Sequence, residues 1–145
     1  MNMKKTLAVF ALATLGVSSA QQCPIPEQTY LDFDFSNVLG FCQDLRTIEG
    51  CDTCYAALVD IIKDPSLDYL DTNTSFEQFG LDAADLLDQC QDNLVSGLQA
   101  DLGFSALQLR GLVDCGFEFG KYPKTIGVVQ QYYESKGVDI SNLEP

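Results

Sequence analysis

The sequence predicts an all-α protein: a small disulfide-stapled helical bundle with an extended N-terminal arm. Two observations predict this class. Apolar residues between Asp82 and Cys115 recur every three or four positions, as on one face of a helix. The chain also carries six cysteines behind an export-type leader, a combination typical of small domains stapled by disulfides.

The N-terminus is typical of a secretory signal peptide. Lys4 and Lys5 precede a short apolar run, Leu7–Gly16, and small residues follow at the expected cleavage position. The run is too short to span a membrane. We therefore divide the chain into a signal peptide, residues 1–20, and a single cysteine-rich helical domain, residues 21–145.

The exported part is strongly acidic. It keeps six basic side chains (8 − 2) against 21 acidic ones, a formal charge of −15 (6 − 21). Nucleic acid and anionic membranes are thereby disfavoured, since both require a basic surface. The C-terminal residues resemble neither a lipid-anchor signal nor a transmembrane segment. We expect a secreted, extracellular protein with no transmembrane anchor, and either a solvated acidic surface or a basic partner.

All six cysteines lie in the exported part, where an even number indicates three structural disulfides. Six cysteines allow fifteen pairings, and the sequence does not choose among them. The predicted disulfide cysteines are Cys23, Cys42, Cys51, Cys54, Cys90 and Cys115.

The N-terminal arm should be extended from residue 21 to 34, because Pro24 and Pro26 oppose a helix. A short helix capped by Ser36 is expected to follow and to end near Phe41. A longer helix should run from Cys51 to Lys63, capped by Asp52 or Thr53. It should end at Asp64-Pro65, since a residue before proline avoids the helical region.

The longest periodic stretch predicts two helices joined by a tight turn. Asp82 is the expected N-cap of the first helix and Gly103 its C-cap. Ser105 and Gln108 have capping-box spacing for the second helix, which Gly116 should end. The apolar face of the first helix comprises Leu86, Leu87, Cys90, Leu94, Leu98 and Leu102.

A last helix should begin with Thr125 as its cap and end at Gly137. The final eight residues are expected to be a frayed tail. The apolar positions of this helix are Ile126, Val129, Tyr132 and Tyr133.

The loop before Asp82 contains an N-glycosylation sequon at Asn73, so we expect that loop to face solvent. The alternating polar residues Asp71, Asn73 and Ser75 also imitate part of a calcium-binding loop. However, Phe76 occupies the position where such a loop needs glycine, and Asp82 stands where it normally has glutamate. A glycosylated turn is the better interpretation.

No catalytic constellation is found in the sequence. The chain has no histidine, which removes Ser-His and Cys-His catalysis and makes a zinc site improbable. The C-x-x-C of Cys51 and Cys54 lacks the βαβ context of a redox site, so we expect each cysteine to pair elsewhere. Asp32 and Asp34 are a nearby acid pair, better explained as solvated surface than as a glycosidase site. We assign no catalytic residue, no metal ligand and no cofactor.

The cysteine spacing resembles that of the SPARK domain, a cysteine-rich extracellular module of plant proteins. The matching residues include Cys23-Pro24, the Cys51–Cys54 cluster, and Cys90 followed by a leucine repeat that leads to Cys115. The family's second cluster has adjacent cysteines where this chain has C-x-x-C. The resemblance implies an extracellular recognition module and supplies no catalytic residue.

Two function hypotheses follow. The first is a secreted, non-enzymatic recognition module that binds an extracellular protein or glycan. The alternative is a soluble carrier of a lipid or sterol-like apolar ligand, held between the helices of Asp82–Cys115 and the Cys51 helix. Carriers of this kind use a space between helices, although protein interiors are normally close-packed.

Overall fold

A computed structural model describes residues 22–102 and 104–145, and this part of the chain is helical with no strand. It confirms the small, disulfide-stapled, all-α bundle. The signal peptide predicted over residues 1–20 and the C-cap predicted at Gly103 lie outside the described residues. The helices are α1 (Glu27–Asp32), α2 (Ile48–Ser66), α3 (Phe76–Gln89), α4 (Gln91–Leu102), α5 (Ala106–Cys115) and α6 (Pro123–Ser135). Short 3-10 turns lie at η2 (Leu39–Phe41), η3 (Leu67–Tyr69), η4 (Phe119–Lys121) and η5 (Ser141–Leu143).

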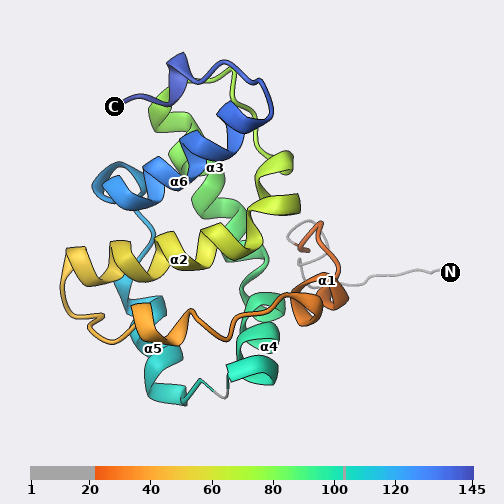
Figure 1. Cartoon of the computed structure of the whole chain (residues 1–145), viewed down its shortest axis with the longest axis vertical. Helices are drawn as coiled ribbons and strands as arrows, with labels where there is room; N and C mark the ends of the chain where they lie inside the picture. Colours follow the sequence, from red (N-terminus) through yellow and green to blue (C-terminus); the bar gives the residue numbers. More distant parts are fainter. Residues whose placement is uncertain (1–21, 103) are drawn as a thin grey trace, which may run out of the picture.

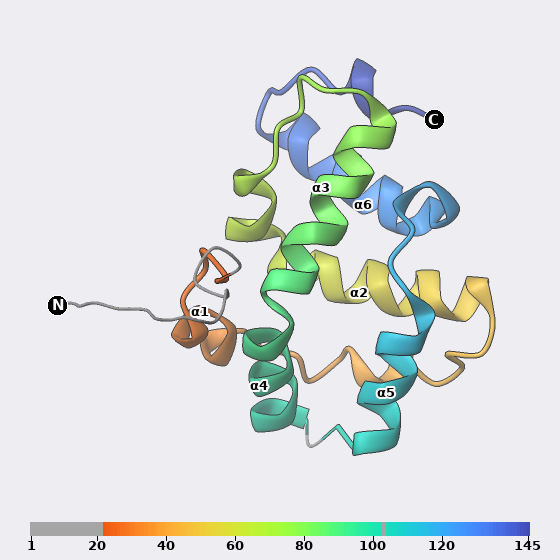
Figure 2. The same ribbon diagram turned by 180° about the vertical axis from the view of Figure 1, so that it is seen from behind.

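Helix α2 lies at the centre of the bundle (Figure 1). It packs against α6 on one side, while α1 packs against α4 near the other end of the molecule. Seen from behind, α3 and α4 follow one another as a bent column, and α5 stands beside α4 (Figure 2). One hydrophobic cluster joins α1, α2, α4 and α5, and a second joins α2, α3, α6 and the C-terminal residues.

Helix α2 begins earlier than predicted. Its cap is Thr47, whose Oγ1 accepts a hydrogen bond from the Gly50 amide at 2.9 Å, so the prediction of Asp52 or Thr53 as cap was wrong. The prediction for its end was close. Asp64 has non-helical backbone angles (φ −109°, ψ 111°) before Pro65, as expected for a residue that precedes proline.

Asp52 instead caps a different helix. Its carboxylate accepts hydrogen bonds from the backbone amides of Lys124 (2.8 Å) and Thr125 (2.9 Å), and from the Thr125 hydroxyl (2.9 Å). These amides belong to the first turn of α6, which begins at Pro123 and leaves its first N–H groups without helical partners. Thr125 is therefore inside α6 and not its cap, contrary to the prediction. Gly137 follows the helix with φ +75°, as predicted.

The predicted helix from Asp82 to Leu102 is two helices. Ser75 caps α3 by accepting from the Gln78 amide at 3.1 Å, which places Asp82 in mid-helix and makes its assignment as cap wrong. The stripe of apolar residues continues across Cys90, where the backbone leaves helical geometry and α4 begins. Helical hydrogen bonding resumes at once after the break, because the Leu94 amide donates to the Cys90 carbonyl at 2.9 Å. The apolar periodicity in the sequence therefore shows no interruption at Cys90.

Three disulfides staple the bundle: Cys23–Cys90, Cys42–Cys54 and Cys51–Cys115. The two cysteines of the C-x-x-C therefore pair with other positions, as predicted. Cys23–Cys90 joins the N-terminal arm to the α3–α4 junction, and Cys51–Cys115 joins the first turn of α2 to the end of α5.

Both ends of the domain differ from the prediction. Pro26 is extended (φ −60°, ψ 147°), but the arm predicted over residues 21–34 is not extended throughout, because α1 occupies Glu27–Asp32 and packs on α4. The approach is close, since a Cβ on Gly97 would lie 2.7 Å from the Tyr30 carbonyl oxygen. The tail is not frayed: Leu143 is fully buried, and its carbonyl accepts from the Gln130 side chain at 3.0 Å. A buried apolar side chain fixes this segment.

Replacement of Asp52 by alanine should lower the free energy of unfolding by about 2–4 kcal/mol. The change removes a helix cap and leaves buried N–H and O–H donors without an acceptor. Urea denaturation measures the effect. Asp60→Ala is the control on the same helix, where an exposed ion pair with Lys63 is worth about 0–1 kcal/mol. Equal losses in the two variants would contradict the capping role.

Peptide mapping without reduction should yield three linked pairs of fragments, joined at Cys23–Cys90, Cys42–Cys54 and Cys51–Cys115. The double variant Cys51→Ser/Cys115→Ser should lose about 2–5 kcal/mol of stability, because the bridge closes a long loop. A fragment containing a Cys51–Cys54 bridge would contradict the pairing.

Candidate functional site

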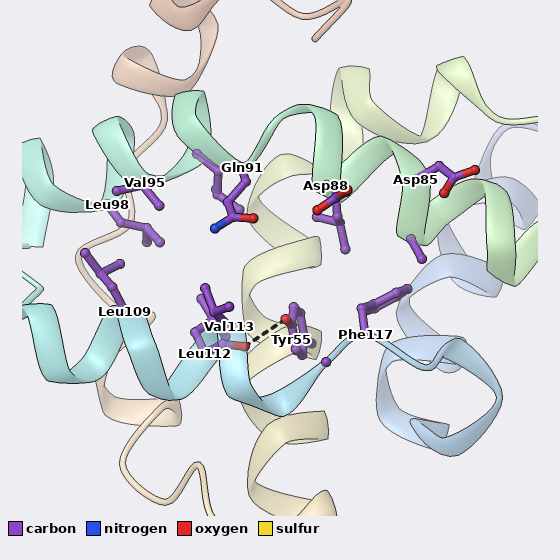
Figure 3. A pocket seen from close by; sticks show the side chains of 14 residues that line it. Tyr55, Asp85, Asp88, Gln91, Val95, Leu98, Leu109, Leu112, Val113 and Phe117 are labelled. Atoms are coloured by element: carbon purple, nitrogen blue, oxygen red, sulfur yellow. Dashed lines mark hydrogen bonds between the residues drawn. The ribbon is translucent and has the colours of Figure 1, made fainter. Parts of the chain in front are cut away.

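A groove lies between α3–α4 on one side and α5 on the other, with α2 at its floor (Figure 3). Its volume is about 330 Å³. We call it the α4–α5 groove. It is lined by Tyr55, Ala84, Asp85, Leu87, Asp88, Gln91, Leu94, Val95, Leu98, Leu109, Leu112, Val113, Gly116 and Phe117.

The first wall is a single stripe along two helices. Its residues recur at alternating spacings of four and three, so they share a face even though the chain bends at Cys90. The middle of the stripe is polar and exposed, and the α4 end is apolar. The stripe consists of Ala84, Asp88, Gln91, Val95 and Leu98.

The second wall is α5, which begins with the predicted capping box. The Ser105 hydroxyl accepts from the Gln108 amide at 3.1 Å, and the Gln108 side chain accepts from the Ser105 amide at 3.0 Å. Leu112 is buried, whereas Val113 is 53 % exposed beside it. The Tyr55 hydroxyl donates to the Leu112 carbonyl at 3.1 Å, which fixes α5 to α2.

An aromatic cluster closes the floor of the groove at the end of α5. Tyr55 stacks on Tyr122 at a centroid distance of 5.6 Å and meets Phe117 edge-on at 5.1 Å. Gly116 turns the chain out of α5 with φ +63°, as predicted for a helix-ending glycine, and its carbonyl accepts from the Tyr122 hydroxyl. The Tyr122 hydroxyl therefore fixes the backbone that immediately precedes Phe117.

The charge that lines the groove is negative. Asp85 and Asp88 belong to the lining and are exposed, and no Lys, Arg or His lies among the lining residues described. The floor of the groove, by contrast, carries no charge at Tyr55. Burial, with a smaller effect of neighbouring Tyr122, raises the pKa of Tyr55 to about 12, so its hydroxyl stays a neutral donor. The groove thus combines apolar walls with a carboxylate edge.

A second, smaller cavity adjoins the groove and shares Leu87 and Phe117 with it. Its volume is only about 40 Å³, which is of the size of a water molecule. The Ser66 hydroxyl is buried there and makes no hydrogen bond. Burial raises the pKa of Tyr30, and the nearby Ser66 hydroxyl partly opposes this rise. This cavity is too small for a lipid chain.

The loop with the sequon holds a turn and a helix cap. Asn73 is exposed, and its amide donates to the Asp71 carboxylate at 2.8 Å, while Ser75 caps α3. The Asp71 carboxylate and the Ser75 hydroxyl, which belong to the pattern that imitates a calcium loop, thus accept local backbone hydrogen bonds. Within residues 22–102 and 104–145, no group of three potential metal-ligating side chains lies close enough to hold a metal ion. Glycosylation of Asn73 stays a prediction.

The Asp32 and Asp34 carboxylates each accept a local hydrogen bond, from Gln28 and from the Ser36 amide. The predicted disulfide cysteines occupy the bundle interior and its seams, not the groove lining. Sequence reasoning had suggested a space between the Asp82–Cys115 helices and the Cys51 helix, which is where the groove lies. It did not identify the stripe. Leu98 of the stripe was predicted on the apolar face, and the missed signal was Ala84 and Val95, which continue that stripe beside the core-facing leucines.

Comparison with known proteins gives no match: no family model, no curated protein and no solved structure is similar to this chain. The resemblance to the SPARK domain therefore stays a prediction. Among the described helices, none combines the length and apolar character that a membrane crossing requires.

The buried tyrosines should make the protein unfold more easily in alkali. Burial raises the pKa of Tyr55, Tyr132 and Tyr133 above the ordinary value of 10.0, to about 12 for Tyr55. As pH rises from 10 to 12 the unfolded chain loses these protons and the folded chain keeps them, so the free energy of unfolding falls. The stabilisation that the buried, protonated tyrosines contribute is fully present below about pH 10.

Denaturation at about pH 8 and pH 11, completed before base attacks the disulfides, measures this loss. Tyr55→Phe should lose less stability between the two pH values than the unmodified protein does. Tyr69→Phe, at a tyrosine that is 51 % exposed, should lose as much as the unmodified protein. A loss in Tyr55→Phe equal to that of Tyr69→Phe would contradict the claim.

Proposed function

We propose that this chain is a secreted, non-enzymatic recognition module that binds an extracellular partner through the α4–α5 groove. One observation carries the proposal: apolar side chains that are only partly buried, such as Val95 and Leu109, line the groove beside exposed carboxylates. Val113 is 53 % exposed on its edge. Exposed apolar patches with a polar edge are typical of interaction sites.

The construction of the groove supports this function. Its first wall is fixed at the α3–α4 junction by Cys23–Cys90, and its second wall at the end of α5 by Cys51–Cys115. Covalent ties at both walls keep the shape before any partner arrives. A preformed site reduces the ordering that binding requires and so favours affinity.

A carrier of an apolar ligand is the second candidate, because the groove volume of about 330 Å³ falls within the range of small-molecule sites, about 300–1,000 Å³. Two features favour a macromolecular partner. Asp85, Asp88, Gln91 and Val113 leave the groove exposed along its edges, whereas ligand sites bury about 70–90 % of a small molecule. The second cavity, which adjoins the groove, is only about 40 Å³.

The resemblance to SPARK ectodomains supports the same class of function, and the three disulfides accord with an extracellular setting. The predicted glycan site, Asn73, is not part of the groove lining, so a glycan there would leave the groove lining itself unmodified. No residue is assigned a catalytic role.

Affinity capture from the extracellular fluid of the host tests the proposal. The unmodified protein should retain a partner protein, and Val113→Glu should reduce the retained amount at least about tenfold, as expected for a residue central to an interface. Ile48→Glu is the matched control: Ile48 is 59 % exposed, lies at the start of α2 and is outside the groove, so its capture should be unchanged.

Native mass spectrometry of the same samples separates the two candidates. Recognition through the groove is supported if the unmodified protein and Ile48→Glu retain a protein partner and Val113→Glu does not. An extractable mass of lipid or sterol size that Val113→Glu loses would favour the carrier instead. Equal capture by both variants would contradict a role for the groove.

A further inference from the structure

The groove does not end at Phe117. A shallower hollow of about 500 Å³ adjoins it and shares Ala84 and Phe117 with it. Leu81, which is 61 % exposed, lines this second hollow. We call these two adjoining hollows together the extended groove. It follows α3 and α4 on one side, and α5 and η4 on the other.

The wall formed by α3 and α4 has a regular spacing along this whole length. Glu77 and Leu81 precede the stripe already described, and they continue its alternation of four and three residues. Pairs of apolar side chains thus alternate with acidic or polar ones along the series Glu77, Leu81, Ala84, Asp88, Gln91, Val95 and Leu98. A wall with the period of a helix is complementary to another helix, whose side chains fit between its ridges.

The charges around the extended groove favour a partner segment of positive charge. Four carboxylates line it, those of Glu77, Asp85, Asp88 and Glu118, against one ammonium group, that of Lys121. The Lys121 Nζ atom lies 2.7 Å from the Glu118 carboxylate, so that charge is already paired. Three carboxylates in excess favour Lys or Arg on the bound segment and repel an acidic one.

The same charges argue against two other occupants. A second copy of this chain would bring the same acidic edge to the contact, which opposes self-association. A fatty acid would place its carboxylate near Asp85 and Asp88, with no basic side chain among the described lining residues of the α4–α5 groove to receive it.

We infer that the extended groove binds a basic amphipathic helix of a partner protein. The apolar face of this helix, at positions i, i+3, i+4 and i+7, packs between α3–α4 and α5, and its Lys or Arg residues flank Asp85 and Asp88. The inference rests on the proposed function, and it specifies the partner's chemistry for the same site.

A synthetic peptide provides the probe. We would use a labelled peptide of about 18 residues built from Leu and Lys, long enough to form a helix, with Leu on one helical face. Its isomer has the same composition in an order that gives no apolar face. Fluorescence anisotropy should show binding of the amphipathic peptide at least about tenfold tighter than that of the isomer, since only the former matches the groove.

Two pairs of variants separate the apolar and the charged contributions. Val113→Ser should weaken binding about tenfold and Ile48→Ser should not, although both residues are about half exposed. The double variant Asp85→Asn/Asp88→Asn should weaken binding about three- to tenfold at low salt, and the difference should vanish near 1 M salt, where the Debye length is about 3 Å. Asp60→Asn/Asp139→Asn is its control, with the same change of net charge away from the groove.

Three results would overturn the inference. The first is equal binding of the peptide and its isomer, which indicates attraction by net charge alone. The second is displacement of the peptide by a neutral lipid such as cholesterol in an equimolar amount, which indicates a carrier. The third is concentration-dependent dimerisation that excludes the peptide. If any of these occurs while Val113→Glu still loses the natural partner in the capture experiment, the proposed function survives without this inference.

Discussion

The stretch Cys51–Cys54 of α2 is the point on which the rest of the structure depends, because it holds three separate segments. Cys51 bonds to the end of α5, Cys54 bonds to the segment at Cys42, and Asp52 between them caps α6. Asp52 is 2 % exposed, and its carboxylate accepts from first-turn N–H groups of α6 that have no acceptor within the helix. Two covalent bonds and one cap therefore meet within four residues and orient α5 and α6 around α2.

This arrangement also determines the groove. The floor residue Tyr55 follows Cys54 directly on α2, and its hydroxyl binds the Leu112 carbonyl of α5. The opposite wall is fixed independently by Cys90 at the junction of α3 and α4. The spacing of the walls is therefore set by two disulfides outside the groove and by the Tyr55–Leu112 hydrogen bond at its floor. The exposed edge residues Asp85, Asp88 and Val113 take no part in these bonds, which is our main physical reason to place recognition at the groove.

Local patterns in the sequence predicted much of the fold. The leucine periodicity, the capping box at Ser105 and the glycines at 116 and 137 were confirmed, because each depends on residues a few positions apart. The errors arose where a distant segment decides. Asp52 looks like a cap of its own helix, but its carboxylate binds the start of α6, more than seventy residues later.

The tail and the groove show the same limit. The final residues are polar enough to suggest fraying, yet Leu143 enters the second hydrophobic cluster and fixes them. The helices that form the groove could be located from the sequence, but whether the space between them is filled depends on the angle at Cys90 and on the bridges. Fifteen possible disulfide pairings left that geometry open.

An NMR titration tests the central claim most directly, since it reports where binding occurs. Addition of the Leu/Lys amphipathic peptide to isotopically labelled protein should shift backbone amide signals of α3, α4, α5 and the Gly116–Glu118 segment, and leave those of α1 and of the C-terminal half of α6 in place. Shifts spread evenly over the acidic surface, or confined to helices outside the groove, would contradict the assignment of the groove as the recognition site.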